Sequence, residues 1–247
     1  MTGNNSAEAF ANSSSSDLII DPAERELFKK RHLGLRLFEP ERKRIPLPAR
    51  STGDIRALYL RSSSRSFSPA RVPLQKLSEV LVSITAHAAT QEIKFAYPSA
   101  GGSYSVQPYV YVRNSARCAV EGIAEGSYYY NPKEHCLYEI GSDRRLDRNA
   151  HALINRPVFD QSSLMICLAI DLSAIEPLYA GESLRMATIE AGMMAQALDL
   201  KGRSMGFGVC HIGTIDESAV GGAFLLSARH RLAHTMLLGL QRADGRS

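Results

Sequence analysis

The stretch Ala96–Val112, AYPSAGGSYSVQPYVYV, constrains the fold more than any other part of the chain. It begins with small residues around Gly101 and Gly102, where the backbone can approach a flat surface because no side chain stands in the way. It ends with Tyr109–Val112, whose aromatic and β-branched residues are typical of a buried strand. A loop of small residues therefore leads directly into the core.

Polar side chains accompany these glycines. Ser99 and Ser103 offer hydroxyls and Gln107 offers an amide, all of which are able to meet polar atoms of a ligand. The same stretch is also typical of a plain tight turn that enters a strand. The rest of the chain has to decide between the two.

Composition excludes several classes of protein. The chain has 247 residues, of which 45% are hydrophobic and 22% charged, as in a soluble globular protein with a sizeable core. The net charge of +4 comes without a long basic run, which argues against nucleic acid and suits an acidic protein partner or an anionic cofactor. The apolar run Leu164–Ile170 is too short to cross a membrane.

The ends and the cysteines indicate a cytoplasmic setting. Residues 1–16 lack the basic start and apolar segment of a secretion signal, so we expect a disordered lead-in there, a domain over residues 17–241 and a tail over 242–247. The cysteines show neither metal-type pairing nor a disulfide framework, and we expect no metal site. They are Cys118, Cys136, Cys167 and Cys210.

The remaining pattern predicts helices and strands without regular alternation, which indicates an α+β fold. Helices are expected near Asp21-Pro22, after Pro73 and over Glu182–Leu200, the last with a Met-rich core face and a stop at Gly202. Extended segments are expected in IPLPARS (45–51), in 127–140 around an Asn131-Pro132 turn, in Leu164–Asp171 and in His234–Leu240.

Two further passages carry polar groups. Arg61, Ser63 and Arg65 alternate, so in an extended segment they share one face and form a phosphate clamp, unless the loop is simply solvated. Gly206–Gly213, GFGVCHIG, is a second passage of small residues after a helix, and its His211 is either structural or functional.

Taken together, these pieces resemble the nitroreductase superfamily of FMN flavoproteins, and within it the SagB-type branch of azoline oxidases. The resemblance spans about Asp17 to Leu240 and implies a central antiparallel-rich sheet flanked by helices, a homodimer, and a flavin lined by both chains. It implies the cofactor contacts, which are Arg61, Ser63, Arg65, Pro98, Ser99, Ala100, Gly101, Gly102, Ser103, Gln107, His211, Ile212, Gly213, Arg229 and Arg231.

The branch's catalytic tyrosine falls on Tyr179 in LYAGESLRMATIEAG. Peptide-tailoring members have a lysine just before it, where this chain has Leu178. A cation there would favour the phenolate, so the departure leaves either Tyr179 or His211 as the base.

Within the branch, DPAERELFKKRHLGLR, ALINRPVF and HRLAHTMLLGL are similar to oxidase domains of nonribosomal peptide synthetases. The resemblance implies oxidation of a carrier-tethered thiazoline or oxazoline to a thiazole or oxazole, after which dioxygen reoxidises the reduced flavin. Three alternatives remain: dehydrogenation of another tethered amino acid, a general NAD(P)H-dependent nitroreductase, and a non-catalytic module that docks onto a synthetase.

Overall fold

The structure, a computed structural model, describes residues 21–31, 61–89, 92–115, 119–141 and 143–242. The chain divides into two units, residues 1–51 and 52–247, and each is described by itself. The described part of the first unit is helix α1 (Pro22–Arg31), capped by Asp21, whose carboxylate accepts the backbone N–H of Glu24 at 2.8 Å. The predicted helix at Asp21-Pro22 is confirmed. The predicted lead-in, the IPLPARS segment and the tail beyond Arg242 lie outside the described residues.

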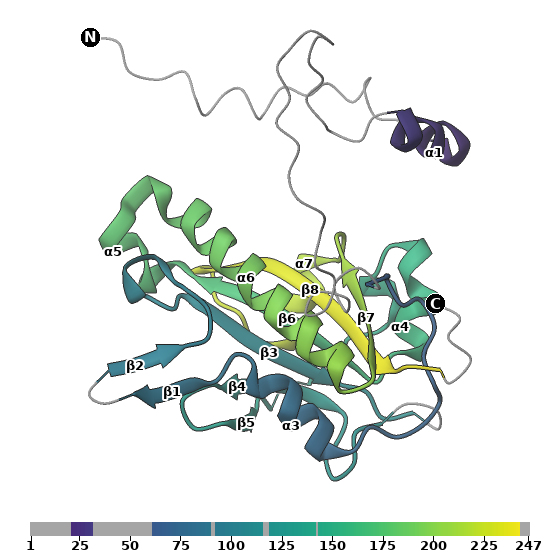
Figure 1. Ribbon diagram of the computed structural model, residues 1–247, viewed down its shortest axis with the longest axis horizontal. Coiled ribbons are helices and arrows are strands. Elements are labelled where there is room, and N and C mark those ends of the chain that lie inside the picture. The colour runs from purple at the N-terminus through teal and green to yellow at the C-terminus, as the bar shows by residue number, and fades with distance from the viewer. Residues whose placement is uncertain (1–20, 32–60, 90–91, 116–118, 142, 243–247) are drawn as a thin grey trace, which may run out of the picture. The chain divides into compact units, whose positions relative to one another are not determined.

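The second unit is built on a six-stranded sheet in the order β5-β4-β3-β6-β8-β7, with every neighbouring pair antiparallel (Figure 1). Its strands are β3 (Val106–Val112), β4 (Gly126–Asn131), β5 (Cys136–Glu139), β6 (Leu164–Asp171), β7 (Phe207–Ile212) and β8 (His230–Leu240). A separate hairpin pairs β1 (Ala86–Ala89) with β2 (Glu92–Phe95). The predicted α+β fold is confirmed.

Helices cover both faces of this sheet (Figure 1). Among the described residues of this unit, the helices are α3 (Leu74–Val82), α4 (Arg156–Gln161), α5 (Glu176–Tyr179), α6 (Ser183–Ser204) and α7 (Glu217–Ala223). Short 3₁₀ turns are Ala100–Gly102, Arg148–Ala150, Leu153–Asn155, Leu172–Ala174 and Ala180–Glu182.

The central strand β6 is buried on both faces, which explains its unbroken apolar sequence. Leu164, Ile166, Leu168 and Ile170 pack in the cluster that includes α3 and α6. Met165, Cys167 and Ala169 pack in the cluster that includes α4 and α7. Successive side chains on a strand point to opposite faces, so one strand supplies both cores.

Two predictions about α6 need correction. The helix does not end at Gly202 but continues to Ser204. Gly202 is buried, and a Cβ at this position would lie 3.3 Å from the Val209 side chain. The glycine therefore allows α6 to pack closely on β7. The Met-rich face is only partly core, since Met194 is fully buried while Met193 is 40% exposed.

The cysteines that the structure describes, Cys136, Cys167 and Cys210, are free thiols, and Cys118 lies outside the described residues. Within the described ranges, no helix has both the length and the apolar character that crossing a membrane requires.

Candidate functional site

The predicted ligand-binding loop lies between β2 and β3 and has an unusual backbone. Gly101 and Gly102 adopt φ of 58° and 67°, and Tyr104 adopts 44°. Left-handed φ values are easy for glycine and uncommon for other residues, so this backbone shape favours glycine at positions 101 and 102. Pro98 and both glycines are exposed, and Ser99, Ala100 and Ser103 are half-buried.

A buried carboxylate on α6 holds this loop in place. Glu190 is 2% exposed, accepts the hydroxyl of Ser99 at 2.6 Å and accepts the backbone N–H of Val106 at 3.2 Å. Ser99 Oγ in turn accepts the backbone N–H of Tyr104 at 2.8 Å. Burial raises the pKa of Glu190, while the hydrogen bond from Ser99 opposes that rise.

The predicted catalytic tyrosine meets the loop at Gly101. Tyr179 is the last residue of α5 and is half-buried, and a Cβ placed on Gly101 would lie 2.8 Å from its hydroxyl oxygen. The same Cβ would lie 3.5 Å from Leu178, whose side chain is 59% exposed. The absent side chain of Gly101 therefore leaves the space in which the Tyr179 hydroxyl sits.

The segment with the predicted phosphate clamp lies beside β7. The Ser64 N–H donates to the Val209 carbonyl at 3.0 Å, and Ser64 is buried. Arg61 and Arg65 are exposed and Ser63 is half-buried. Burial raises the pKa of the Cys210 thiol, and the charges of Arg65 and Arg203 oppose that rise.

The second predicted basic pair lies at the start of β8. Arg231 donates to the carbonyl oxygens of Ala228 and His230 at 2.7 and 2.8 Å, and Arg229 is exposed. Burial tends to raise the pKa of Asp171, but hydrogen bonds from Ser173 and the charges of His230 and Arg229 hold it below its usual value. The Asp171 carboxylate therefore interacts with Arg229 of this pair and with His230.

Gln107 belongs to the same neighbourhood. Its side-chain amide donates to Asp171 Oδ2 at 3.5 Å, and its carbonyl oxygen accepts the hydroxyl of Tyr109 at 2.8 Å. Gln107 is therefore linked to the Asp171 end of β6.

His211 is one member of a chain of four polar side chains. Arg203 donates from Nε to both carboxylate oxygens of Asp199 at 3.0 and 3.1 Å. Asp199 Oδ1 lies 3.6 Å from His211 Nε2, and His211 Nδ1 lies 2.7 Å from His234 Nε2. Burial of Asp199 would raise its pKa, but His211 and Arg203 hold it low. The chain joins α6 to both β7 and β8.

His234 and the end of β7 border a cavity of about 300 Å³. Burial, reinforced by His211, lowers the pKa of His234 to about 4, so its ring is neutral near pH 7. Ile212 and Gly213, both predicted cofactor contacts, also line this cavity. Among the predicted site residues, Tyr179 therefore lies against the loop at Gly101. His211 contacts His234, which lines the same cavity as Gly213.

Sequence reasoning missed Glu190, Asp199 and His234. The positions of Glu190 and Asp199 gave one usable signal, because a carboxylate on the buried stripe of a long amphipathic helix requires partners. His234 gave no comparable signal, since its contact with His211 depends on how β8 pairs with β7.

A flavin is compatible with these residues. The loop presents small exposed residues at Gly101 and Gly102, against which a flat ring can lie. Exposed guanidiniums at Arg61 and Arg65 suit a phosphate. The donor set matches an anionic cofactor with a flat ring.

Comparison with known proteins agrees with this geometry. Residues 58–240 match the model of the Nitroreductase family. A protein of Methanocaldococcus jannaschii whose name describes it as a nitroreductase is 27% identical over 164 residues, which cover 66% of this chain and 79% of that protein.

Solved structures share the fold at low identity. One chain of the Escherichia coli microcin synthetase McbBCD complex with truncated pro-MccB17 bound is 15% identical with a TM-score of 0.71, over 95% of this chain and 86% of that one. A Desulfovibrio desulfuricans nitroreductase in complex with FMN is 17% identical with a TM-score of 0.54, over 80% and 91%. On the family match over most of its length, this chain belongs to the Nitroreductase family of oxidoreductases.

Proposed function

We propose that this chain is an FMN-dependent oxidase that aromatises a thiazoline or oxazoline tethered to a carrier protein of a nonribosomal peptide synthetase. The observation that carries the proposal is the placement of Tyr179 directly against Gly101, because it puts a phenol beside the small-residue loop that would lie along a flavin. The fold similarity to a chain of the microcin synthetase complex with bound truncated pro-MccB17 is compatible with a tethered peptide substrate.

The proposal gives the basic and small residues the task of holding FMN. Arg61, Ser63 and Arg65 would bind the phosphate from the β7 side, with Arg229 and Arg231 as a second basic pair. The residues that would line the ring are Pro98, Ser99, Ala100, Gly101, Gly102, Ser103, Gln107, His211, Ile212 and Gly213. When bound, FMN supplies an acceptor for a hydride, and so for two electrons.

Tyr179 is proposed as the group that receives the proton from the azoline ring carbon. Its neighbour Leu178 brings no positive charge, so the loop and the bound ring would have to supply the polar surroundings of the phenol. Glu190 supports this role at a distance, since it fixes the loop against which Tyr179 lies.

His211 is the alternative proton acceptor, and the hydrogen-bond chain bears on which of its nitrogens is free. Asp199 near Nε2 favours a proton on that nitrogen, and Nδ1 is then the acceptor for His234 Nε2–H. Both ring nitrogens are thereby engaged, which favours a positioning and electrostatic role for His211 beside the cofactor.

We also propose a homodimer. The outer face of α6 presents Ile189, Met193 and Leu200, which are 45%, 40% and 38% exposed at spacings of four and seven residues. These spacings place all three on one helical stripe, which a second copy would cover. Light scattering at micromolar concentration should give twice the chain mass, and a monomer with redox-active FMN would contradict the proposal.

The same site would suit two other reactions. Dehydrogenation of a different tethered amino acid would use the same residues, and a general nitroreductase would use NAD(P)H as the reductant. Rapid flavin reduction by NAD(P)H, with none by a carrier-bound thiazoline, would favour the nitroreductase.

The decisive experiment combines cofactor identification with two variants. Denaturation should release about one FMN per chain, and release of FAD or of no flavin would contradict the proposal. Tyr179→Phe should keep the flavin and lose about 10²–10⁴ in turnover of a carrier-bound thiazoline. His211→Ala should instead alter the flavin spectrum, and normal turnover by Tyr179→Phe with a dead His211→Ala would reverse the roles.

A further inference from the structure

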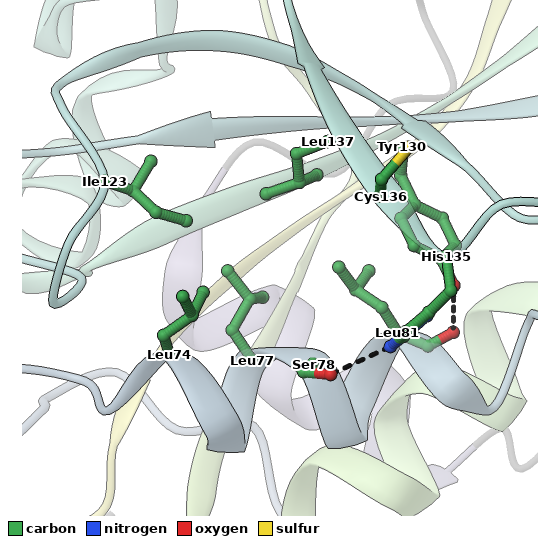
Figure 2. A pocket seen from close by; sticks show the side chains of 9 residues that line it. All are labelled: Leu74, Leu77, Ser78, Leu81, Ile123, Tyr130, His135, Cys136 and Leu137. Atoms are coloured by element: carbon green, nitrogen blue, oxygen red, sulfur yellow. Dashed lines mark hydrogen bonds between the residues drawn. The ribbon is translucent and has the colours of Figure 1, made fainter.

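A second cavity lies between α3 and the β4–β5 hairpin, and we call it the α3 cavity. It measures about 280 Å³ (Figure 2). β5 and β4 form one edge of the six-stranded sheet, whereas β7, with His211, forms the other. The α3 cavity is therefore separate from the His211 end of the proposed oxidase site.

The wall of the α3 cavity is mainly apolar. Leu74, Leu77 and Leu81 face it from α3, at spacings of three and four residues that align them along one side of the helix. Ile123 and Leu137 point toward them from the opposite wall, as Figure 2 shows. Leu74 is 45% exposed, so the cavity is open to solvent at that end.

The other end of the α3 cavity is polar and rigid. His135 Nε2 lies 2.8 Å from Ser78 Oγ, and His135 Nδ1 lies 2.6 Å from the hydroxyl of Tyr130 (Figure 2). The Tyr130 hydroxyl also lies 2.6 Å from Thr85 Oγ1. His135 has a φ of 51°, a conformation uncommon for a residue with a side chain, and these contacts hold it there.

The direction of these hydrogen bonds follows from their far end. The Leu81 carbonyl can only accept, and both Thr85 Oγ1 and the Tyr130 hydroxyl lie 3.2 Å from it. If either hydroxyl donates to that carbonyl, the Tyr130 hydrogen is used on the carbonyl or on Thr85, so His135 Nδ1–H donates to Tyr130 and Ser78 donates to His135 Nε2. This order gives every hydrogen an acceptor, whereas the reverse order leaves the carbonyl without a hydroxyl partner.

The consequence concerns Ser78. Its hydrogen is used on His135, so its oxygen keeps lone pairs that can accept a hydrogen bond at the edge of the cavity. The described residues that line the cavity include no carboxylate, lysine or arginine. An apolar wall with one acceptor and no full charge selects neutral ligands.

We propose that the α3 cavity is a binding site for a small neutral molecule with an apolar body and one hydroxyl or N–H donor, which Ser78 accepts. Such a ligand would cover the leucines of α3 and leave no charge buried. This site is independent of the proposed oxidase function, since it shares no residue with the proposed flavin contacts.

The test measures the binding of matched small-molecule probes to the chain by two-dimensional amide NMR. The probe is 4-ethylphenol, with 4-ethylanisole as the analogue whose donor is capped and 4-ethylbenzoate as the charged analogue. We expect 4-ethylphenol to shift amides of α3 and the β4–β5 hairpin and to bind about fivefold more tightly than 4-ethylanisole, as for one neutral hydrogen bond. The benzoate should not bind.

Two variants assign the binding to this site. Ser78→Ala should lower the affinity for 4-ethylphenol about fivefold and leave that for 4-ethylanisole unchanged. Leu74→Glu, at the open and half-exposed first position of α3, should abolish binding of both, while Gln75→Glu beside it should bind as wild type. Equal binding of phenol and anisole, an unchanged Ser78→Ala, or absence of amide shifts would overturn the proposal.

Discussion

The hydroxyl of Ser99 donates a 2.6 Å hydrogen bond to the buried carboxylate of Glu190, across 91 positions of sequence. The other oxygen of that carboxylate accepts the Val106 N–H, so a single side chain of α6 fixes both ends of the loop that precedes β3. We expect Glu190→Ala to leave the half-buried Ser99 hydroxyl and the buried Val106 N–H without their acceptor and to cost about 2–5 kcal/mol of unfolding free energy. Urea denaturation measures this change.

Glu182→Gln is the control, because within the described part of the chain Glu182 forms an ion pair with Arg185 and both side chains are more than half exposed. It should change the unfolding free energy by less than about 1 kcal/mol. Equal losses in the two variants would mean that Glu190 does not hold the loop.

The Tyr179 hydroxyl next to Gly101 allows a cycle of substitutions. Gly101→Ala should be destabilising for two reasons: a φ of 58°, and a Cβ only 2.8 Å from the hydroxyl. Gly102→Ala carries only the first cost, about 1–2 kcal/mol, since its φ is 67° and nothing lies within 4 Å of its Cβ. Thermal unfolding should give a lower melting temperature for Gly101→Ala than for Gly102→Ala.

Removing the hydroxyl tests the contact itself. Without that oxygen the nearest ring atom to the new Cβ is 3.4 Å away, so Gly101→Ala combined with Tyr179→Phe should recover stability toward that of Gly102→Ala. Strictly additive losses would show that the phenol does not occupy this space.

Buried histidine makes the fold sensitive to mild acid. His151 is 2% exposed, and burial together with Arg113 lowers its pKa to about 4. The unfolded chain binds a proton on this histidine below about pH 6.5 and the folded chain does not, so stability falls as pH drops from 6.5 toward 4. The slope from this residue is at most about 1.4 kcal/mol per pH unit.

His151→Phe should flatten that slope, because the ring packs on Phe159 at 4.5 Å between centroids and neither nitrogen has a hydrogen-bond partner among the described residues. Urea midpoints at pH 7, 6 and 5 measure the slope. A slope that stays unchanged in His151→Phe would refute the assignment.

The exposed guanidinium of Arg65 is the most direct test of the phosphate clamp. Arg65→Ala should weaken FMN binding about 10- to 150-fold, which corresponds to a charged hydrogen bond of about 1.5–3 kcal/mol. Arg71 is equally exposed but lies at the approach to α3, so Arg71→Ala should bind FMN as wild type. Fluorescence titration of the apoprotein with FMN distinguishes the two results.

The sequence predicted the elements whose character is local. Leu164–Ile170 is apolar throughout because both faces of β6 are covered, and the predicted strand Leu164–Asp171 is the observed one. Gly202 predicts a helix end because glycine is common there, whereas in the structure it permits close contact with Val209.

The parts of the site that sequence reasoning missed depend on tertiary contacts. Glu190 meets Ser99, and Asp199 meets His211, only after α6 has packed on the sheet. His234 meets His211 because β8 pairs with β7. Residue type alone cannot indicate partners that distant strands and helices bring together.

The central claim is that the flavin oxidises a tethered azoline directly. The measurement is anaerobic mixing of the purified holoprotein with a carrier-bound thiazoline, followed by flavin absorbance and by the mass of the carrier-bound product. We expect the yellow flavin absorbance to bleach in step with a loss of about two mass units, one hydride and one proton. Retained absorbance and unchanged mass, in a protein whose flavin NADPH reduces rapidly, would contradict it.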